Sequence, residues 1–388
     1  MSKNIPCRRW VIAVFTIASS IVVFDDSCDA SRIPDTLRFS GLTFVKKLER
    51  AYHVSPRLIL VNERQNPAYV MAELFEKSVA FLNKQGKVVT IDSFATEPGF
   101  AASKYGDWLY LWGRKNYADS FHRIYGPAGK ILFEKIAPST GNEPSTGIPL
   151  KVPGDFLKIN SLECEIDIID TSGNIIHTAR PLQDGATGNI IYDTDSSGNM
   201  LFVAVSPGDY TIFTYYDASL VEQRHAVLTL NNAILLSAAG DGRFALINFY
   251  DAGEGWPLLA VSSAGERLFQ ISYPKAWSIS GNNKFLAVAD GAGEVSLINT
   301  NTWQSILKID TLMLIQAGIR GDWRSIDFSD DSEYLLAMGD QALISINIAG
   351  LSWQVLPFPY AIVRARLLNG STELLLIGEM GWAAYRRL

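Results

Sequence analysis

Short apolar runs, each following a polar turn, recur along most of this chain at a nearly constant interval. Their central residues lie 40 to 49 positions apart, at Leu109, Leu157, Leu201, Phe244, Leu286, Leu335 and Leu375. Segments of this length are typical of β-strands, and one such unit cannot bury its apolar side chains alone. The interval therefore predicts one array of packed, repeated units.

The second half of each unit repeats as well. FLNKQGKVVTI (81–91), YGPAGKILFEKI (125–136) and IIDTSGNIIHTA (168–179) each place an apolar strand, a polar turn with glycine and an alternating strand in the same order. The turn glycines at positions 86, 129 and 173 are 43 and 44 residues apart. Glycine suits these turns because tight hairpins need positive φ.

One unit can be divided into four antiparallel strands from the sequence alone. AWSIS is the expected inner strand, followed by FLAVAD, EVSLINT and the outer strand SILKID, over 276–280, 285–290, 294–300 and 305–310. A period in the forties made of four short strands is typical of propeller blades. The predicted fold is all-β: a single β-propeller of eight, alternatively seven, four-stranded blades over residues 57–388.

The last unit ends after three strands, at GWAAYRRL (381–388). An N-terminal segment, residues 31–56, is therefore predicted to close the ring, with TFVKKLERAY (43–52) as the missing fourth strand. The alternative depends on YVMAELFEKSVAFL (69–82), which also has helical spacing. If that stretch is a helix, KVVTIDSF (87–94) closes a ring of seven blades behind an N-terminal cap.

In GKVVTI, GKILFEKI and GNIIHTA the chain resembles the broad propeller superfamily that includes WD40-like and quinoprotein-like (PQQ-type) repeats. The resemblance covers most of the chain and implies the fold. The repeated tryptophan pattern of quinoproteins is absent, as are WD and GH pairs. The resemblance therefore supplies no catalytic residues.

The N-terminus is typical of an export signal. Lys3, Arg8 and Arg9 precede the apolar run 10–24, and Ala30 ends a site suited to cleavage. Residues 1–30 are predicted to be a cleaved signal peptide, which places the protein in the periplasm or outside the cell. Because a spanning helix needs about 20 apolar residues, an uncleaved inner-membrane anchor is the alternative.

Composition limits the partners. Charged residues make up 19% of the chain and the net charge is −6, so no basic face is expected and nucleic acid is excluded. The predicted partner is a protein or peptide of the cell envelope, and a membrane is contacted only through an uncleaved anchor.

DTDSSGNM (193–200) resembles the start of a calcium loop. A calcium loop of the helix-flanked type needs a bidentate acid at its twelfth position, which here is Ala204. The same place in other units reads SAAGDG, SISGNN, DFSDDS and LLNGST, which are interchangeable as turns and not as ligand sets. DTDSSGNM is therefore predicted to be a polar turn, and no metal site is predicted.

Acidic residues follow the second strand of several units, at Asp209, Asp251, Asp290, Asp340 and Glu379. Equivalent positions in a ring lie on one face, where these carboxylates could bind a cation, an amine or a basic segment. The simpler interpretation is that each acid caps its own turn. Glu254 and Trp256 in the loop YDAGEGWP (250–257), and Trp323 in a long connection, are further binding candidates on that face.

These patterns favour an exported binding or assembly module that engages a protein or ligand through one loop face. The alternative is a propeller enzyme of the quinoprotein, lactonase or hydrolase kind, with a metal or cofactor at the channel mouth. No catalytic residues and no cofactor are predicted, and calcium is the ion that a site made of carboxylates and Asn could hold.

Overall fold

A computed structural model gives the fold. It describes residues 34–388, apart from segments whose placement is uncertain: 53–55, 64, 103–105, 115–118, 139–146, 152–154, 161–164, 170–173, 182–188, 195–199, 207–209, 218, 254, 318–322, 340–341, 359–361 and 379–380. The predicted signal peptide lies outside the described residues. No helix in the described part of the chain has the length and apolar character needed to cross a membrane.

In the described residues the strands form eight antiparallel sheets. Seven are built from four consecutive strands, and the eighth combines the last three strands of the chain with the first two. The first contains β3 (Leu58–Asn62), β4 (Tyr69–Leu74), β5 (Ser78–Leu82) and β6 (Val88–Ser93). The second contains β7 (Gly99–Ala102), β8 (Leu109–Arg114), β9 (Asp119–Tyr125) and β10 (Ile131–Pro138), with the short helix η1 (Pro127–Gly129) in a turn. The third contains β11 (Gly147–Lys151), β12 (Asp155–Asn160), β13 (Glu165–Ile169) and β14 (Ile175–Ala179). The fourth contains β15 (Asn189–Thr194), β16 (Met200–Ser206), β17 (Thr211–Asp217) and β18 (Glu222–Leu228).

The second half of the chain continues the pattern. The fifth sheet contains β19 (Asn231–Ala238), β20 (Phe244–Tyr250), β21 (Leu258–Ser262) and β22 (Arg267–Ile271). The sixth contains β23 (Pro274–Ile279), β24 (Phe285–Asp290), β25 (Val295–Asn299) and β26 (Gln304–Ile309), followed by helix α1 (Thr311–Gln316). The seventh contains β27 (Trp323–Phe328), β28 (Tyr334–Gly339), β29 (Ala342–Asn347) and β30 (Ser352–Pro357). The eighth contains β31 (Ile362–Leu368), β32 (Glu373–Gly378), β33 (Gly381–Arg387) and two N-terminal strands, β2 (Leu42–Ala51) and β1 (Thr36–Phe39).

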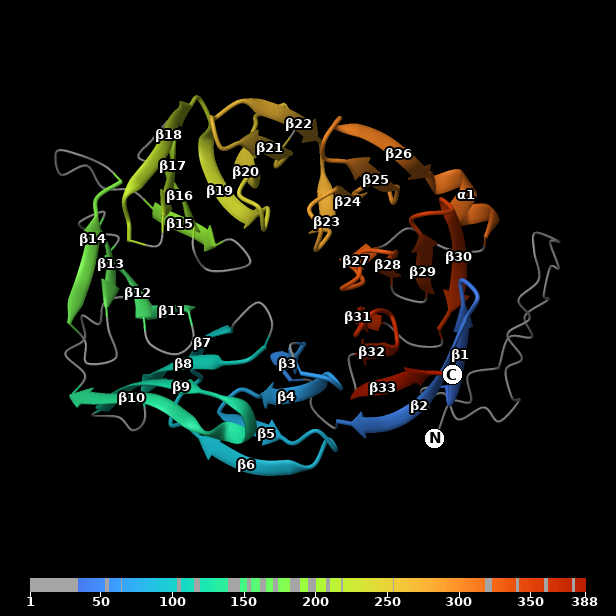
Figure 1. The fold of residues 1–388 in the computed structure, drawn as a ribbon, viewed down its shortest axis with the longest axis horizontal. Coiled ribbons are helices and arrows are strands. Elements are labelled where there is room, and N and C mark those ends of the chain that lie inside the picture. The colour runs from blue at the N-terminus through green and yellow to red at the C-terminus, as the bar shows by residue number, and fades with distance from the viewer. Residues whose placement is uncertain are drawn as a thin grey trace, which may run out of the picture.

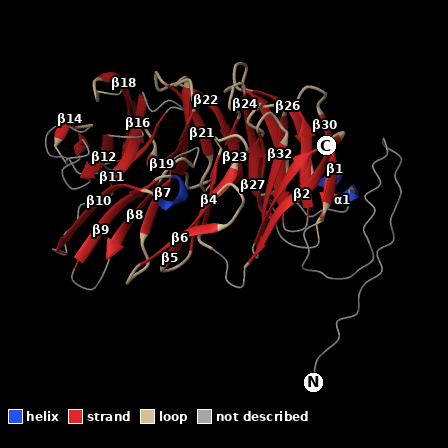
Figure 2. Ribbon diagram, turned by 60° about the horizontal axis from the view of Figure 1, so that its bottom comes forward, coloured by secondary structure: helices blue, strands red, loops and turns tan. Residues whose placement is uncertain are grey.

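The sheets follow one another around a ring (Figure 1). In the sheets β3–β6 and β23–β26 the first strand lies towards the middle of the ring and the fourth at its periphery. Strands of successive sheets stand side by side when the ring is tilted (Figure 2). Each sheet sends its second-to-third-strand turn and its link to the next sheet to the same side of the ring. We call this side the connection face, and the other side the opposite face.

Apolar runs form the second strands because both faces of those strands are buried. In β28, Leu336 and Met338 belong to a core cluster shared with the eighth sheet, whereas Leu335 and Ala337 belong to one shared with the sixth. Alternate side chains of a strand point to opposite faces, so each sheet packs on both of its neighbours. Burying one such side chain stabilises the fold by about 1.5–3 kcal/mol.

Several of the described third-to-fourth-strand turns follow a common scheme. Asn83 accepts hydrogen bonds through Oδ1 from the backbone N–H groups of Gln85 and Lys87, both at 3.0 Å. Gly86 has a φ of +71°. Asp217 uses its Oδ1 in the same way in the fourth sheet. A short polar side chain and a residue with positive φ therefore form these turns, as the sequence predicts.

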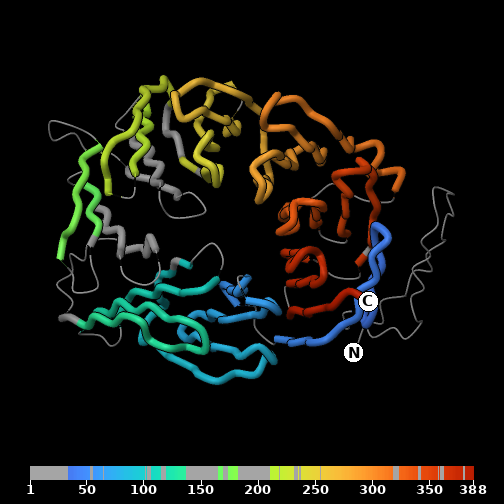
Figure 3. Tube along the Cα trace, viewed as in Figure 1, coloured from blue at the N-terminus to red at the C-terminus, as the bar shows by residue number. Residues whose placement is uncertain are grey.

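N-terminal strands close the ring. β2 pairs antiparallel with β33, and β1 extends this sheet by pairing with β2. The segment β1–β2 runs beside the C-terminal strand (Figure 3). A buried carboxylate secures the join: Glu73 accepts hydrogen bonds from Tyr52 at 2.5 Å and Trp382 at 3.0 Å, and pairs with Arg50 at 2.8 Å.

The predicted strands agree closely with the structure. The stretch 285–290 is β24 to the residue, and the other three strands of that unit differ by one or two residues at their ends. Residues 69–82 form β4 and β5 and not a helix, while 88–93 is the outer strand β6. The expectation that an N-terminal strand completes the last sheet is confirmed.

Candidate functional site

Two of the predicted acids are used inside their own turns. Asp290 accepts hydrogen bonds through Oδ1 from the N–H groups of Ala292 and Glu294, both at 2.9 Å. Asp251 accepts one from Gly253 at 2.8 Å through the same atom. These contacts support the turn-capping interpretation at both positions. Asp209, Glu254, Asp340 and Glu379 lie outside the described residues.

Trp323 does not lie on the surface, in contrast to the expectation that it is a rim residue. Its side chain is only 4% exposed, and Nε1 donates a hydrogen bond to the carbonyl oxygen of Gly293 at 2.7 Å. A tryptophan whose N–H finds a backbone acceptor can be buried without loss. Trp323 therefore joins the sixth and seventh sheets and cannot be reached by a ligand in this structure.

Trp256 is exposed on the connection face, together with five other large apolar side chains of the fifth and sixth sheets and the links that follow them. Each of the six has between 42% and 62% of its surface exposed: Tyr250, Trp256, Tyr273, Leu312, Met313 and Ile315. We call these six residues the apolar band. Exposed aromatic and aliphatic groups that gather on one face are typical of protein interaction sites.

Local contacts connect the members of the apolar band. The rings of Tyr250 and Trp256 meet edge to face, with centroids 5.6 Å apart. The Tyr273 ring reaches within 3.4 Å of the point where a Cβ would stand on Gly255, in the same loop. Tyr273 in turn accepts a backbone hydrogen bond from Gly291 at 2.7 Å.

The helix α1 completes the apolar band. Thr311 donates a hydrogen bond to the carbonyl oxygen of Ala292 at 2.8 Å, so α1 lies against the turn that follows β24. Asp310 caps the helix by accepting from the N–H of Met313 at 2.8 Å. Leu314 is buried in the core, whereas the other large apolar side chains of this helix face outwards.

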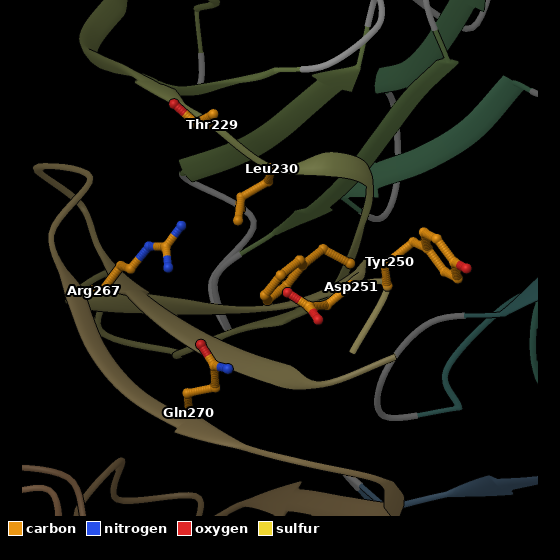
Figure 4. Close-up of a pocket in the computed structure, with 8 residues that line it drawn as sticks. Thr229, Leu230, Tyr250, Asp251, Arg267 and Gln270 are labelled. Atoms are coloured by element: carbon orange, nitrogen blue, oxygen red, sulfur yellow. The ribbon is translucent and has the colours of Figure 1, made fainter. Parts of the chain in front are cut away.

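A pocket of about 300 Å³ lies beside the band (Figure 4). The loop after β20 contributes Asp251 and Ala252, while Arg267 and Gln270 reach it from the outer strand β22. Its other lining residues are Thr229, Leu230, Phe249 and Tyr250. The pocket thus combines a cation, a carboxylate and an amide next to an exposed aromatic ring.

The opposite face has a structural role in the described residues. Its first-to-second-strand turns are bonded to one another: Gly240 donates to Asn283 Oδ1 at 2.8 Å, and Ser371 donates to Asp331 Oδ2 at 2.7 Å. The N–H of Asn282, in the turn of the sixth sheet, donates to Ser332, in the turn of the seventh, at 3.3 Å. SAAGDG, SISGNN, DFSDDS and LLNGST therefore join neighbouring sheets, which supports their interpretation as turns. Residues 195–199 of DTDSSGNM lie outside the described residues.

Two ion pairs join inner strands of neighbouring sheets near the middle of the ring. Arg364 on β31 donates through Nε to Asp327 on β27 at 3.1 Å, and Arg366 pairs with Glu63 beside β3. Burial raises the pKa of Asp327, and the guanidinium of Arg364 opposes that effect. These pairs join the seventh, eighth and first sheets around the middle of the ring.

Metal-binding groups are not assembled in the described part of the chain, where no three His, Cys, Asp or Glu side chains come together. His177 and His225 lie on the outer strands β14 and β18. Cys164 lies outside the described residues.

No protein-family model matches the sequence, and no curated protein matches it. Solved structures do. The chain is similar to the crystal structure of a eukaryotic initiation factor, with a TM-score of 0.53 and 12% identity over 88% of this chain and 83% of that one. It is also similar to the C-terminal WD40 domain of Sif2, with a TM-score of 0.54 and 9% identity over 88% of this chain and 98% of that one.

The chain has a WD40-like β-propeller fold. At these identities the likeness concerns the fold alone. The predicted all-β propeller fold, built from four-stranded antiparallel sheets, is confirmed.

Several surface residues of this propeller escape sequence reasoning. Leu312, Met313 and Ile315 stand in TLMLIQ, an apolar run inside a long connection. An apolar run in a connection, outside any predicted strand, indicates side chains that the fold leaves exposed, and the sequence does contain this signal. Tyr273, Arg267 and the pocket carry no such signal, because the pocket forms only where the link after the fourth sheet lies beside the fifth sheet.

Proposed function

We propose that this chain is an exported β-propeller that binds or assembles with a protein partner through the connection face. The apolar band is the observation that carries the proposal. Aromatic anchors surrounded by aliphatic side chains are the groups that contribute most to protein–protein affinity. WD40-like propellers offer such a face on a rigid ring, which supports a scaffold function over chemistry.

Exposed apolar side chains on the outer strands are weaker evidence for a binding site than the apolar band. Ile91, Ile131, Ile175 and Val227 are also exposed, but they lie on the outer strands β6, β10, β14 and β18. β-Branched residues are common on outer strands because they favour extended backbone. The apolar band instead occupies turns, a connection and a short helix, where strand propensity does not explain them.

Export rests on the N-terminal pattern of Lys3, Arg8 and Arg9 before the apolar run 10–24. The proposal expects a mature protein that begins at residue 31, in the periplasm or outside the cell. N-terminal sequencing of the protein from fractionated cells tests this. An intact N-terminus in a soluble cytoplasmic fraction would contradict export and leave the binding proposal to its own test.

The binding test places a photo-crosslinking amino acid at Leu312 and identifies the protein that is captured. Affinity for that partner is then measured for Trp256→Ala and for the double variant Leu312→Ser/Ile315→Ser. We expect each to weaken binding at least about 30-fold, the cost of losing a central anchor. The melting temperature should stay unchanged because these side chains are exposed.

The matched control is Ile175→Ser/Ile176→Ser, which removes two exposed isoleucines from the outer strand β14. It should bind as the original protein does. Equal affinity in the band variants and the control, or stronger crosslinking from residue 175 than from residue 312, would overturn the proposal.

A further inference from the structure

Four described acidic side chains around the apolar band have partners within the chain, while Glu254 lies outside the described residues. Asp251 and Asp290 each accept backbone hydrogen bonds in their own turns, and Asp310 caps α1. Glu294 pairs with Lys308 at 2.7 Å. Each of these acidic side chains has a partner within the chain, which reduces its value for binding another molecule.

Two positive groups beside the band are different. Arg267 and Lys275 are both exposed, and within the described residues neither has an ion pair or a side-chain hydrogen bond. Arg267 lines the pocket. Lys275 Cε lies 3.9 Å from the point where a Cβ would stand on Gly291, and Tyr273 Cβ lies 3.4 Å from the same point.

From this charge distribution we infer that the connection face binds an acidic peptide segment, in which carboxylates alternate with apolar side chains. The inference rests on the proposed function. A carboxylate of the segment pairs with Arg267 in the pocket, and another approaches Lys275. Apolar side chains of the segment cover Tyr250, Trp256 and Tyr273.

The pocket restricts how the acidic group enters. Asp251 lines the pocket too, and its charge repels an anion on that side, so the incoming carboxylate lies at the wall formed by β22 (Figure 4). An arginine fork suits this task because it binds a carboxylate through two parallel hydrogen bonds. The size of the pocket suits a single side chain.

Exposed aromatic side chains next to cations could also bind a lipid surface, which is the alternative to an acidic peptide. Basic segments that bind anionic membranes usually contain four to eight Lys or Arg residues, because each contributes only about 1 kcal/mol. Two cations fall short of that number. A concave pocket admits a side chain of a peptide more readily than the flat surface of a bilayer.

The experiment selects a random linear peptide library on the immobilised chain from residue 31 onwards. The same selection is made on Arg267→Glu/Lys275→Glu, and on Leu312→Ser/Ile315→Ser. The control is Lys84→Glu/Lys284→Glu, an equal charge reversal at two exposed lysines in turns of the opposite face. Circular dichroism and thermal melting confirm that each variant is folded.

We expect peptides selected on the original chain to be rich in Asp or Glu next to aromatic or aliphatic residues. Their affinity should fall at least about tenfold on Arg267→Glu/Lys275→Glu and stay unchanged on the control. Binding of the best peptide should weaken as salt rises.

Other outcomes separate the two proposals. Peptides that need Leu312 and Ile315 but show no acidic preference would overturn this inference and leave the proposed function standing. If no selected peptide needs the band, and the band variants still bind the captured partner, both fail. Binding to vesicles of phosphatidylserine and phosphatidylcholine that depends on Arg267 and Lys275, without acidic peptides, would replace the peptide with a membrane.

Discussion

Asp290 shows how one side chain can serve the fold where the sequence suggests a ligand site. Its Oδ1 accepts from two backbone N–H groups of the turn after β24. Asp217 makes the same pair of bonds, with Ser219 and Val221, in a turn on the opposite face. Because the arrangement occurs on both faces, it belongs to the turn and not to a ring of ligands.

Replacement of Asp290 separates these roles. Asp290→Ala removes both acceptors and should lower the free energy of unfolding by about 1 kcal/mol. Asp290→Asn keeps Oδ1, so its free energy of unfolding and its affinity for the partner should both stay close to those of the original protein. Denaturant titrations of both, with Asp217→Ala as the matched turn variant, measure this. Normal stability combined with weaker partner binding in Asp290→Asn would restore the acidic-ring hypothesis.

At the scale of elements, β2 is held in place by more than its backbone ladder. Arg50 lies on β2, Glu73 on β4 and Trp382 on β33. One buried carboxylate therefore connects the first sheet with the eighth, where the two ends of the chain meet. Burial and the hydrogen bond to Glu73 raise the pKa of Tyr52, which therefore remains a donor. Glu73 is fully buried, so its charge needs these partners.

Arg50→Ala tests this connection. The variant leaves a buried carboxylate without its counter-charge, and we expect the free energy of unfolding to fall by about 3 kcal/mol. Lys47→Ala, at an exposed position of the same strand, should change it by less than about 0.5 kcal/mol. Urea unfolding followed by tryptophan fluorescence is the measurement. Equal effects of the two variants would show that the carboxylate does not secure the ring.

At the scale of the whole molecule, the ring depends on strands that lie far apart in sequence. Leu37, Phe39 and Phe44 from the N-terminal strands share a core cluster with Leu356 and Tyr385. Without β1 and β2, this cluster and the free edge of β33 would be exposed to solvent. Exposed edge strands pair with other chains.

A chain that begins at residue 57 should therefore self-associate, whereas one that begins at residue 31 should be monomeric. Size-exclusion chromatography with light scattering compares them. A synthetic peptide of residues 34–52 should restore the monomer by pairing with β33. A monomeric, equally stable chain from residue 57 would show that β2 is dispensable for closure.

The strands were predictable because their signals are local. Alternation, apolar runs and turn residues repeat in each unit, so 285–290 is correct to the residue and the limits of its neighbours are off by one or two. The turn role of Asp290 was likewise within reach, because an acid at the start of a tight hairpin caps it wherever the hairpin lies. α1 was not foreseen, because six residues are too few to show a helical period.

The sequence by itself thus determined the repeat, the four-stranded units and the need for an N-terminal closing strand. Only the tertiary structure decided what depends on packing between units. It buried Trp323 between two sheets and brought Glu73 to Trp382 across 309 positions. It also brought Thr229, from the link after the fourth unit, and Arg267 of the fifth unit to one pocket. The physical reason is that strand formation depends on neighbours along the chain, whereas burial and charge pairing depend on which blades meet.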